Sequence, residues 1–388
     1  MENSALPHGN VINIDPEGDL LLDVGGDEDS ESSQPQRLRV CSSTLRRHSP
    51  VWKQMLFGSW KESKPANVES EKWTVKLPGD SVKPLQIVLN IIHGRFNQIP
   101  HSLDLDELYN LLIFTNKYDV TGTLRPWCVQ WAVVAHGDLS SEDTLKSLFV
   151  SWELGDEDLF ALRIEEISVN TSPQDSFPSI QAVNLFRKPG LAGGSEAEDE
   201  EWIVLEHQDY LGPHGIIGTF SINVLLSIRK KVLFTIAMAV DDDLVSRRYP
   251  PYGTACSASQ VHNSGRLKGT ATLCDAAIYG GLMIHMDQRL LTLMNRGIIK
   301  TDSVVQVAAS VFSNIKLIEV LPNHTQCSLH RKYEALDQEI HEKLPGLVAK
   351  HITPGHKSYM ENQRNKTGIE LSSQAEGKRI PTSTRRYW

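Results

Sequence analysis

Short strand-like segments followed by helical ones, in a fixed order, most constrain how the N-terminal part of the chain can fold. Residues 11–14 and 19–24 are largely apolar and flank the turn-forming sequence Asp15-Pro16-Glu17-Gly18. Residues 37–40 and 73–77 alternate apolar and polar side chains, which is the period of a half-buried strand. Pro and Gly favour turns for separate steric reasons. The sequence therefore predicts a strand pair around that turn and two further short strands.

Helical patterns follow the strands. After Ser81, which suits a helix N-cap, apolar residues recur at four- and three-residue steps. Residues 104–107, with Asp and Glu three positions apart, resemble a capping box at the start of another helix. Helices are also predicted over 45–56 and 124–134. Strands first and paired helices afterwards indicate an α+β fold.

Beyond residue 140 the pattern is mainly helical. Residues 187–201 are rich in Gly, Ala and Glu and predict a linker, and residues from 353 onward lose the apolar period and predict a disordered basic tail. Helices are predicted over 215–240, 274–294, 303–320 and 328–344. The expected domains are a flexible N-terminus at 1–10, an α+β domain at 11–136, a helical segment at 140–186, the linker, a helical region at 202–350, and the tail at 353–388.

Length and composition limit the classes of protein that this chain can be. Its 388 residues suggest more than one domain, and a net charge of −9 argues against nucleic acid or an anionic membrane as a general partner. The longest apolar run, Leu233–Val240, is far shorter than the ~20 residues that cross a bilayer, and no secretory leader is visible at Met1. Five scattered cysteines predict a reducing compartment, either cytoplasm or nucleus.

Four motifs occur in order between residues 18 and 120. They are GDLLLDVG at 18–25, LRRHSPVWKQML at 45–56, LPGD at 77–80 followed by IVLNIIHG at 87–94, and LYNLL at 108–112 followed by KYDV at 117–120. In this order they resemble the successive elements of BTB/POZ domains, and Cys41 before the first helix is similar to the fungal branch of that family. The resemblance covers residues 11–136 and implies a small mixed sheet covered by helical hairpins.

The same resemblance implies where partners bind. Trp60-Lys61-Glu62 matches the hydrophobic-x-Glu motif by which many BTB domains contact the cullin scaffold of a ubiquitin ligase. A large apolar side chain can anchor in a pocket while a carboxylate fixes the register. The alternative interpretation is that Trp60 covers the core of its own domain and that Glu62 is simply solvated.

Homodimerisation is also implied, largely through the first helix and the N-terminal strand. We expect Val51, Trp52 and Met55 to contribute to that interface. Repressor-type BTB domains pair a first-strand Asp with a basic residue before the helix. Asp19 matches the Asp, but Ser42 stands at the basic position, so the repressor-type pocket is not expected.

The second half of the chain contains a conceivable zinc set, Cys256, Cys274 and the pair His324-x-x-Cys327. Thiolate and imidazole suit zinc, and a spacing of three lets two ligands reach one ion. However, Cys256 and Cys274 lack the tight Cys-x-x-Cys spacing, and burial as a thiol is the usual fate of cysteine. The sequence alone therefore predicts no metal and no other cofactor.

The predicted function is that of a non-enzymatic adaptor. The chain has no phosphate-binding loop, no nucleophile elbow, no His-Glu-x-x-His motif and no convergent acid, base or nucleophile set. The resemblance implies a homodimer that presents an unknown client protein, with a cullin-type ubiquitin ligase as the scaffold. The alternative is a structural or regulatory dimerisation module, in the nucleus for example, with no ligase role.

Overall fold

The structure is a computed structural model in which two compact units are distinguished. It describes residues 11–25, 36–65, 73–137, 139–170, 222–250, 254–256, 268–285, 303–318, 320–322 and 324–370. The first unit, here the sheet unit, comprises residues 1–139, 146–160 and 354–379; the second, here the helical unit, comprises residues 140–145, 161–353 and 380–388. The predicted flexible N-terminus at 1–10 and the predicted linker at 187–201 lie outside the described residues.

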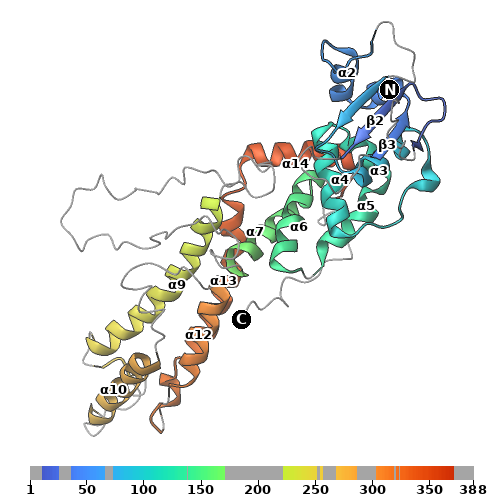
Figure 1. Ribbon diagram of the computed structural model, residues 1–388. Coiled ribbons are helices and arrows are strands. Elements are labelled where there is room, and N and C mark those ends of the chain that lie inside the picture. Colours follow the sequence, from blue (N-terminus) through green and yellow to red (C-terminus); the bar gives the residue numbers. More distant parts are fainter. Residues whose placement is uncertain are drawn as a thin grey trace, which may run out of the picture. The chain divides into compact units, whose positions relative to one another are not determined.

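A small mixed sheet forms one part of the sheet unit (Figure 1). Its strands are β1 (Ile12–Asn13), β2 (Leu20–Val24), β3 (Gln36–Val40) and β4 (Thr74–Leu77), in the order β1-β3-β2-β4. β2 pairs antiparallel with β3 and parallel with β4, and β1 pairs parallel with β3.

The predicted pairing of the first two strands around their turn is wrong, because β3 lies between them. The reason is burial. Leu20, Leu22 and Val24 are fully buried and Leu21 is nearly so, so β2 is covered on both faces and takes the central position with a partner on each edge. The short β1 is left to pair at the outer edge of β3.

The other described elements that lie wholly within the sheet unit are helices and 3-10 turns. They are α1 (Ser42–His48), α2 (Pro50–Phe57), α3 (Val82–Ile92), α4 (Leu105–Lys117), α5 (Arg125–Ala132) and α14 (Pro354–Thr367), with the 3-10 turns η2 (Phe96–Gln98), η3 (Thr121–Leu124) and η4 (Val133–His136). Helices α6 (Ser141–Leu154) and α7 (Glu157–Asn170) each cross from one unit to the other along the chain. Mixed sheet first and helices afterwards give the predicted α+β organisation.

Residues 45–56 form two helices instead of the single one predicted, and the break is at Ser49. Ser49 accepts a hydrogen bond from the backbone of Trp52 at 2.9 Å, which makes it the N-cap of α2, and Pro50 follows at the first helical position. The Ser49 hydroxyl also donates to the Tyr118 carbonyl at 2.6 Å. The predicted capping box is confirmed, because Asp104 and Glu107 each accept from the backbone N–H of the other.

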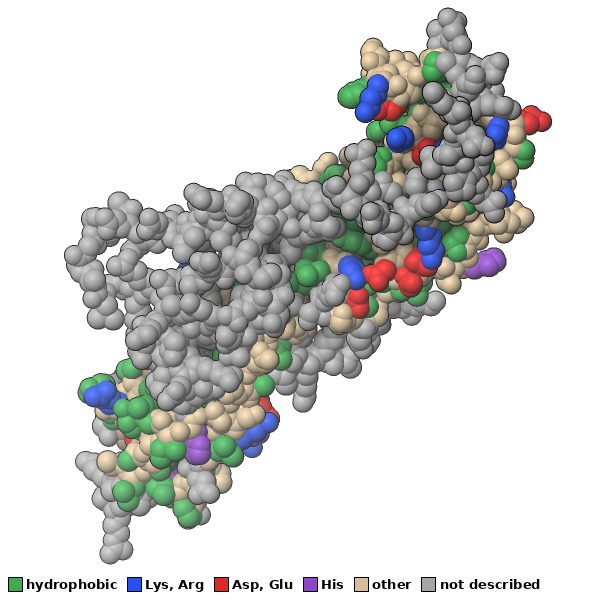
Figure 2. Space-filling view, viewed as in Figure 1, with side chains coloured by type: hydrophobic (Ala, Val, Ile, Leu, Met, Phe, Trp, Pro, Cys, Tyr) green, Lys and Arg blue, Asp and Glu red, His purple; other side chains and the backbone are tan. Residues whose placement is uncertain are grey.

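Among the described residues, four helices lie wholly within the helical unit. They are α9 (Ile222–Arg248), α10 (Lys268–His285), α12 (Val304–Lys316) and α13 (His330–Ala349), with the turn η6 (Thr325–Cys327) before α13. Helix α9 contacts each of the other three. Leu273, Met283 and Ile284 of α10 are exposed. Hydrophobic side chains gather on the surface at the end of the helical unit that contains α10 (Figure 2). None of the helices described is long and apolar enough to span a bilayer.

The prediction of disorder from residue 353 onward is wrong for α14, which is a regular helix in the sheet unit. Its buried residues are His356, Met360, Gln363 and Thr367, spaced by four, three and four. That spacing is a normal buried helix face. The face is mostly polar, so the sequence shows no apolar period. Residues 371–388 lie outside the described residues.

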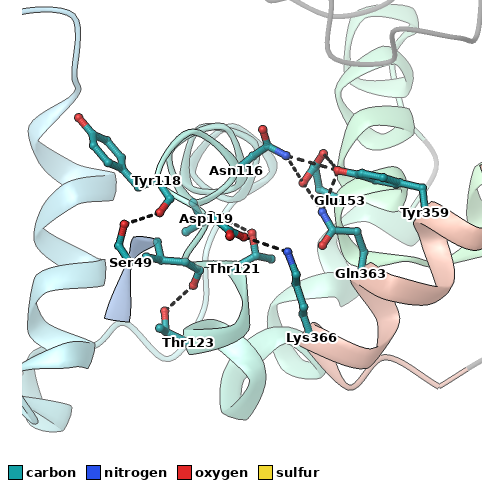
Figure 3. Close-up of polar contacts among 12 residues, drawn as sticks. Ser49, Asn116, Tyr118, Asp119, Thr121, Thr123, Glu153, Tyr359, Gln363 and Lys366 are labelled. Atoms are coloured by element: carbon teal, nitrogen blue, oxygen red, sulfur yellow. Dashed lines mark hydrogen bonds and ion pairs between the residues drawn. The ribbon is translucent and has the colours of Figure 1, made fainter. Parts of the chain in front are cut away.

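Glu153 of α6 is the centre of the contact between α14 and the rest of the sheet unit (Figure 3). Its fully buried carboxylate accepts hydrogen bonds from Tyr359 at 2.9 Å, Gln363 at 2.8 Å and Asn116 at 3.0 Å. Burial raises the pKa of Glu153, and the three hydrogen bonds offset that rise only in part. Close packing adds to the contact, because a Cβ on Gly155 would collide with the α14 backbone.

Candidate functional site

The loop that follows α2 presents Trp60, Lys61 and Glu62, and Ser63 holds it in shape. The Ser63 hydroxyl donates to the Gly58 carbonyl at 2.8 Å and accepts from the backbone N–H of Trp60 at 3.2 Å. The backbone N–H of the next residue, Lys64, donates a hydrogen bond to the Leu56 carbonyl at 2.9 Å. These bonds close the loop onto the end of α2, so the backbone around Trp60 is fixed locally.

Trp60 is on the surface and not in the core. It is 60% exposed, whereas Trp73 is 4% exposed and fills the core beneath this loop. The Trp73 indole N–H donates to the Glu62 carbonyl at 3.1 Å, so Glu62 is tied to the core by its backbone. Its carboxylate lies 3.6 Å from the Lys61 ammonium. Trp60 therefore covers little of the core of its own unit.

The three residues expected at a dimer interface differ in exposure. Val51 is 38% exposed and Met55 is partly buried. Trp52 is fully buried, and its ring lies 5.0 Å from that of Tyr118 and 6.3 Å from that of Phe114, measured between centroids. Trp52 is therefore a core residue of the sheet unit, and of the three only Val51 and Met55 offer surface to a partner.

Asp19 has a basic partner that the sequence did not indicate. Its carboxylate accepts hydrogen bonds from the backbone and the hydroxyl of Ser42, both at 2.8 Å. It also accepts one from Lys64 at 2.7 Å. Burial alone would raise the pKa of Asp19, but the bonds from Lys64 and Ser42 outweigh it and hold that pKa below its ordinary value. Lys64 thus joins the Trp60 loop to the start of β2.

A second candidate site lies in the helical unit, where Cys256, Cys274, His324 and Cys327 come together. Their possible ligand atoms all lie within 4.8 Å of one another, and all four residues are buried. The Cys256 Sγ lies 3.1 Å from the His324 Nδ1 and 3.6 Å from the Cys327 Sγ. Among the described residues this is the group of His, Cys, Asp and Glu side chains that could hold a metal ion.

Asp275 positions Cys256 beside Cys274. Asp275 follows Cys274 on α10, and its carboxylate accepts hydrogen bonds from the Thr254 hydroxyl at 2.6 Å and the Ala255 backbone at 2.9 Å. The same carboxylate forms an ion pair of 2.5 Å with Arg247 of α9. Segment 254–256 is therefore held against α10 directly beside Cys274. The interval of 18 residues between Cys256 and Cys274 did not predict this attachment through Asp275.

The turn η6 brings His324 and Cys327 together. The Cys327 backbone N–H donates to the His324 carbonyl at 2.8 Å, and the His324 N–H donates to the Leu321 carbonyl at 3.0 Å. This tight turn places two residues three positions apart on one side, as the sequence spacing indicated. Burial raises the pKa of Cys274, and the nearby thiols of Cys327 and Cys256 raise it further.

Comparison with protein-family models, with curated proteins and with solved structures finds no match for this chain. The geometry of the two sites therefore carries the functional argument.

Proposed function

We propose that this protein is a non-enzymatic adaptor whose sheet unit is a BTB/POZ-type interaction domain. The resemblance of residues 11–136 to that family implies a small mixed sheet with helical hairpins. A mixed sheet of four strands, followed by the paired helices α1 and α2 and then by α3 to α5, is consistent with it. The proposed partners are a second copy of the chain and a client protein, and the proposed compartment is the cytoplasm or the nucleus.

The exposed Trp60 is the observation that carries this proposal. The indole is 60% exposed to water. Its transfer from water to the apolar pocket of a partner would lower the free energy of the complex. Tryptophan is among the residues most enriched at interface hot spots. The loop around it is already closed by Ser63, so a partner that binds Trp60 loses little entropy in ordering the backbone.

The chemistry of the loop suits a scaffold with an apolar pocket and a positively charged rim. Trp60 would fill the pocket, and the Glu62 carboxylate, whose backbone is tied to Trp73, would fix the register. We propose the N-terminal region of a cullin as that scaffold, which would make the protein a substrate adaptor of a ubiquitin ligase. The proposal rests on the likeness of Trp60-Lys61-Glu62 to the hydrophobic-x-Glu motif of cullin-binding BTB domains.

A dimerisation module without a ligase role is the second candidate. The observation that favours it is the exposed surface of Val51 and Met55 on α2, which a second copy could cover. The two candidates differ in whether Trp60 has a partner.

Titration of the full-length protein with the N-terminal region of a cullin from the same organism tests the proposal. Trp60→Ala should weaken binding roughly thirtyfold, because loss of a buried interface aromatic costs ~2 kcal/mol or more. Glu62→Lys should also weaken it by leaving a charge unpaired at the contact. Phe96→Ala is the matched control, since Phe96 is 63% exposed and lies outside the loop.

Melting curves of each variant accompany the titration. The adaptor proposal requires that Trp60→Ala and Phe96→Ala melt as the unaltered protein does. If the unaltered protein binds no cullin, the ligase role fails and the dimerisation module takes its place. If Phe96→Ala weakens binding as much as Trp60→Ala, the contact is not at the Trp60 loop.

A further inference from the structure

We propose that Cys256, Cys274, His324 and Cys327 bind one Zn²⁺ ion in a closed structural site within the helical unit. The proposal is independent of the adaptor function, which uses residues of the sheet unit. It replaces the expectation from sequence that these thiols are only buried core residues.

The spacing of the donor atoms fits tetrahedral zinc. With Zn–S bonds of about 2.3 Å and Zn–N bonds of about 2.0 Å, a tetrahedron separates two sulfurs by about 3.8 Å and a sulfur from a nitrogen by about 3.5 Å. Cys256 and Cys327 are separated by 3.6 Å between sulfurs, and Cys256 and His324 by 3.1 Å between sulfur and Nδ1. Small movements of side chains would therefore bring four ligands to one ion.

The composition of the group is unusual for a hydrophobic core. A core is filled at lowest cost by Leu, Ile and Val, which carry no polar atoms. Here three thiols and an imidazole gather their heteroatoms within 4.8 Å, with their ligand residues coming from three separate segments. A disulfide would use only two of the sulfurs, and all five cysteines of the chain are present as thiols. Thiolate and imidazole together in a tetrahedron are the donor set that zinc prefers.

Burial and the number of ligands indicate a structural role. Cys274 is fully buried, and Cys256, Cys327 and His324 are 1%, 2% and 7% exposed. Four protein ligands complete the coordination of zinc, whereas catalytic sites leave one position to water or substrate. The ion would therefore hold protein segments together and would not activate a water molecule.

The segments that the ion would join explain why it is needed. Cys256 follows α9, Cys274 is on α10, and His324 and Cys327 lie in the connection between α12 and α13. One ion would thus join α10 to the segment that follows α9 and to the connection between α12 and α13. Because such a site does not exist in the unfolded chain, the free energy of zinc binding contributes directly to folding.

The experiment measures the metal in the full-length protein after purification without chelators. Elemental analysis should give one zinc per chain, and replacement by Co²⁺ should give the strong d–d absorption of a tetrahedral thiolate site together with a sulfur-to-cobalt charge-transfer band. Cys256→Ser and Cys327→Ser should lose the zinc. Cys128→Ser is the matched control, because Cys128 is a buried cysteine of the sheet unit and should leave the zinc in place.

His324→Cys is a conservative variant that tests the geometry. It should keep the ion and shift the Co²⁺ spectrum toward that of a four-sulfur site. Zinc retained in both serine variants would overturn the proposal, since the ion would then lie elsewhere. A folded protein that contains no zinc and gives no tetrahedral Co²⁺ spectrum on titration with that metal would also overturn it. If the serine variants do not fold, the Co²⁺ spectra of the unaltered protein and of His324→Cys decide.

Discussion

Glu153 in α6 accepts a hydrogen bond of 2.9 Å from the Tyr359 hydroxyl in α14, although 206 positions separate the two residues in the sequence. Gln363 and Asn116 donate to the other oxygen of the same carboxylate. The rings of Trp152 and Tyr359 stack next to this group, with centroids 4.4 Å apart. A buried acid with a raised pKa thus lies where α14 joins the rest of the sheet unit, so the stability of this contact depends on pH.

Replacement of Glu153 by Gln should make the protein more stable near neutral pH and less sensitive to pH. The pKa of Glu153 is raised in the folded state above its ordinary value of 4.5. Its favourable contribution is therefore complete below that value and is lost as pH rises through the folded pKa. Glutamine keeps the shape and can still pair with Tyr359 and Asn116, but it does not ionise. Melting temperatures of both proteins between about pH 4 and about pH 8 test this.

Glu153→Ala is the control for that prediction. It removes the hydrogen-bond partners of Tyr359 and Gln363 at every pH, so it should destabilise the protein throughout the range. Parallel curves for the unaltered protein and Glu153→Gln would mean that Glu153 does not ionise differently in the folded state.

Trp52 and Trp60 should respond in opposite ways to truncation. Trp52→Ala should lower the free energy of unfolding by about 3–5 kcal/mol, because it empties a fully buried site against Phe114 and Tyr118. Trp60→Ala should change it by no more than about 0.5 kcal/mol, as for most surface positions. Urea denaturation of the full-length variants measures both values. A large loss in Trp60→Ala would place that indole in the core and remove the basis of the proposed contact.

Dimerisation should depend on Val51 and Met55. In sedimentation the full-length chain should have twice the monomer mass, and Val51→Asp together with Met55→Asp should shift it toward the monomer, because buried unpaired charges oppose association. Leu273→Asp is a control on an exposed apolar residue of α10 in the helical unit and should leave the dimer intact. A monomer at tens of micromolar in the unaltered protein would argue against both proposed functions.

Lys64 should make the sheet unit more sensitive to acid. The pKa of Asp19 is held below its ordinary value of 3.8, so its contribution is present above that value and is lost as pH falls through the folded pKa. Lys64→Met removes one cause of the lowered pKa and should therefore reduce the loss of stability on acidification. The Lys64 side chain is 48% exposed, so the effect should be less than about 1 kcal/mol.

The measurement is chemical denaturation at about pH 7 and about pH 3. Lys61→Met is the matched control. The Lys61 side chain is 91% exposed, lies on the same loop and pairs with Glu62, whereas Lys64 is the lysine that pairs with Asp19. An identical acid response in the unaltered protein and Lys64→Met would show that Ser42 alone accounts for the pKa of Asp19.

Asp275→Asn should weaken the proposed zinc site without removing a ligand. The Asp275 carboxylate positions Thr254 and Ala255 next to Cys256, and loss of such supporting contacts typically lowers metal affinity about tenfold to a hundredfold. Competition with a chromogenic chelator measures the change. Glu339→Gln, in an exposed pair with Lys343 on α13, is the control and should compete as the unaltered protein does. Equal affinities in all three proteins would contradict the positioning role of Asp275.

The sequence predicted the features that depend on neighbouring residues better than those that depend on tertiary packing. The Asp104 and Glu107 capping box needs only neighbouring residues, and it is confirmed. The partner of β2 depends on which strands compete for its edges, so the predicted pairing with β1 is wrong. Trp52 and Trp60 are both tryptophans near one helix, and only tertiary packing decides that the first is buried and the second exposed.

The candidate metal residues show the same limit. His324 and Cys327 lie three positions apart, and the sequence indicated that they could share an ion. Cys256 and Cys274 become neighbours through Asp275, which no spacing rule reveals. Helix α14 was missed because His356, Gln363 and Thr367 make its buried face polar, and a search for apolar periodicity cannot detect such a face.

The place of α14 in the fold also bears on how the protein is made. The ribosome synthesises the sheet and helices α1 to α5 early, but α14, which covers Glu153 and Trp152, is synthesised only after helices α9 to α13 of the helical unit. During that interval the Glu153 carboxyl and the Trp152 indole of the nascent chain are not yet covered by α14. Partly folded chains with such exposed groups bind chaperones or misassemble. Premature termination before α14 would leave every product in that state.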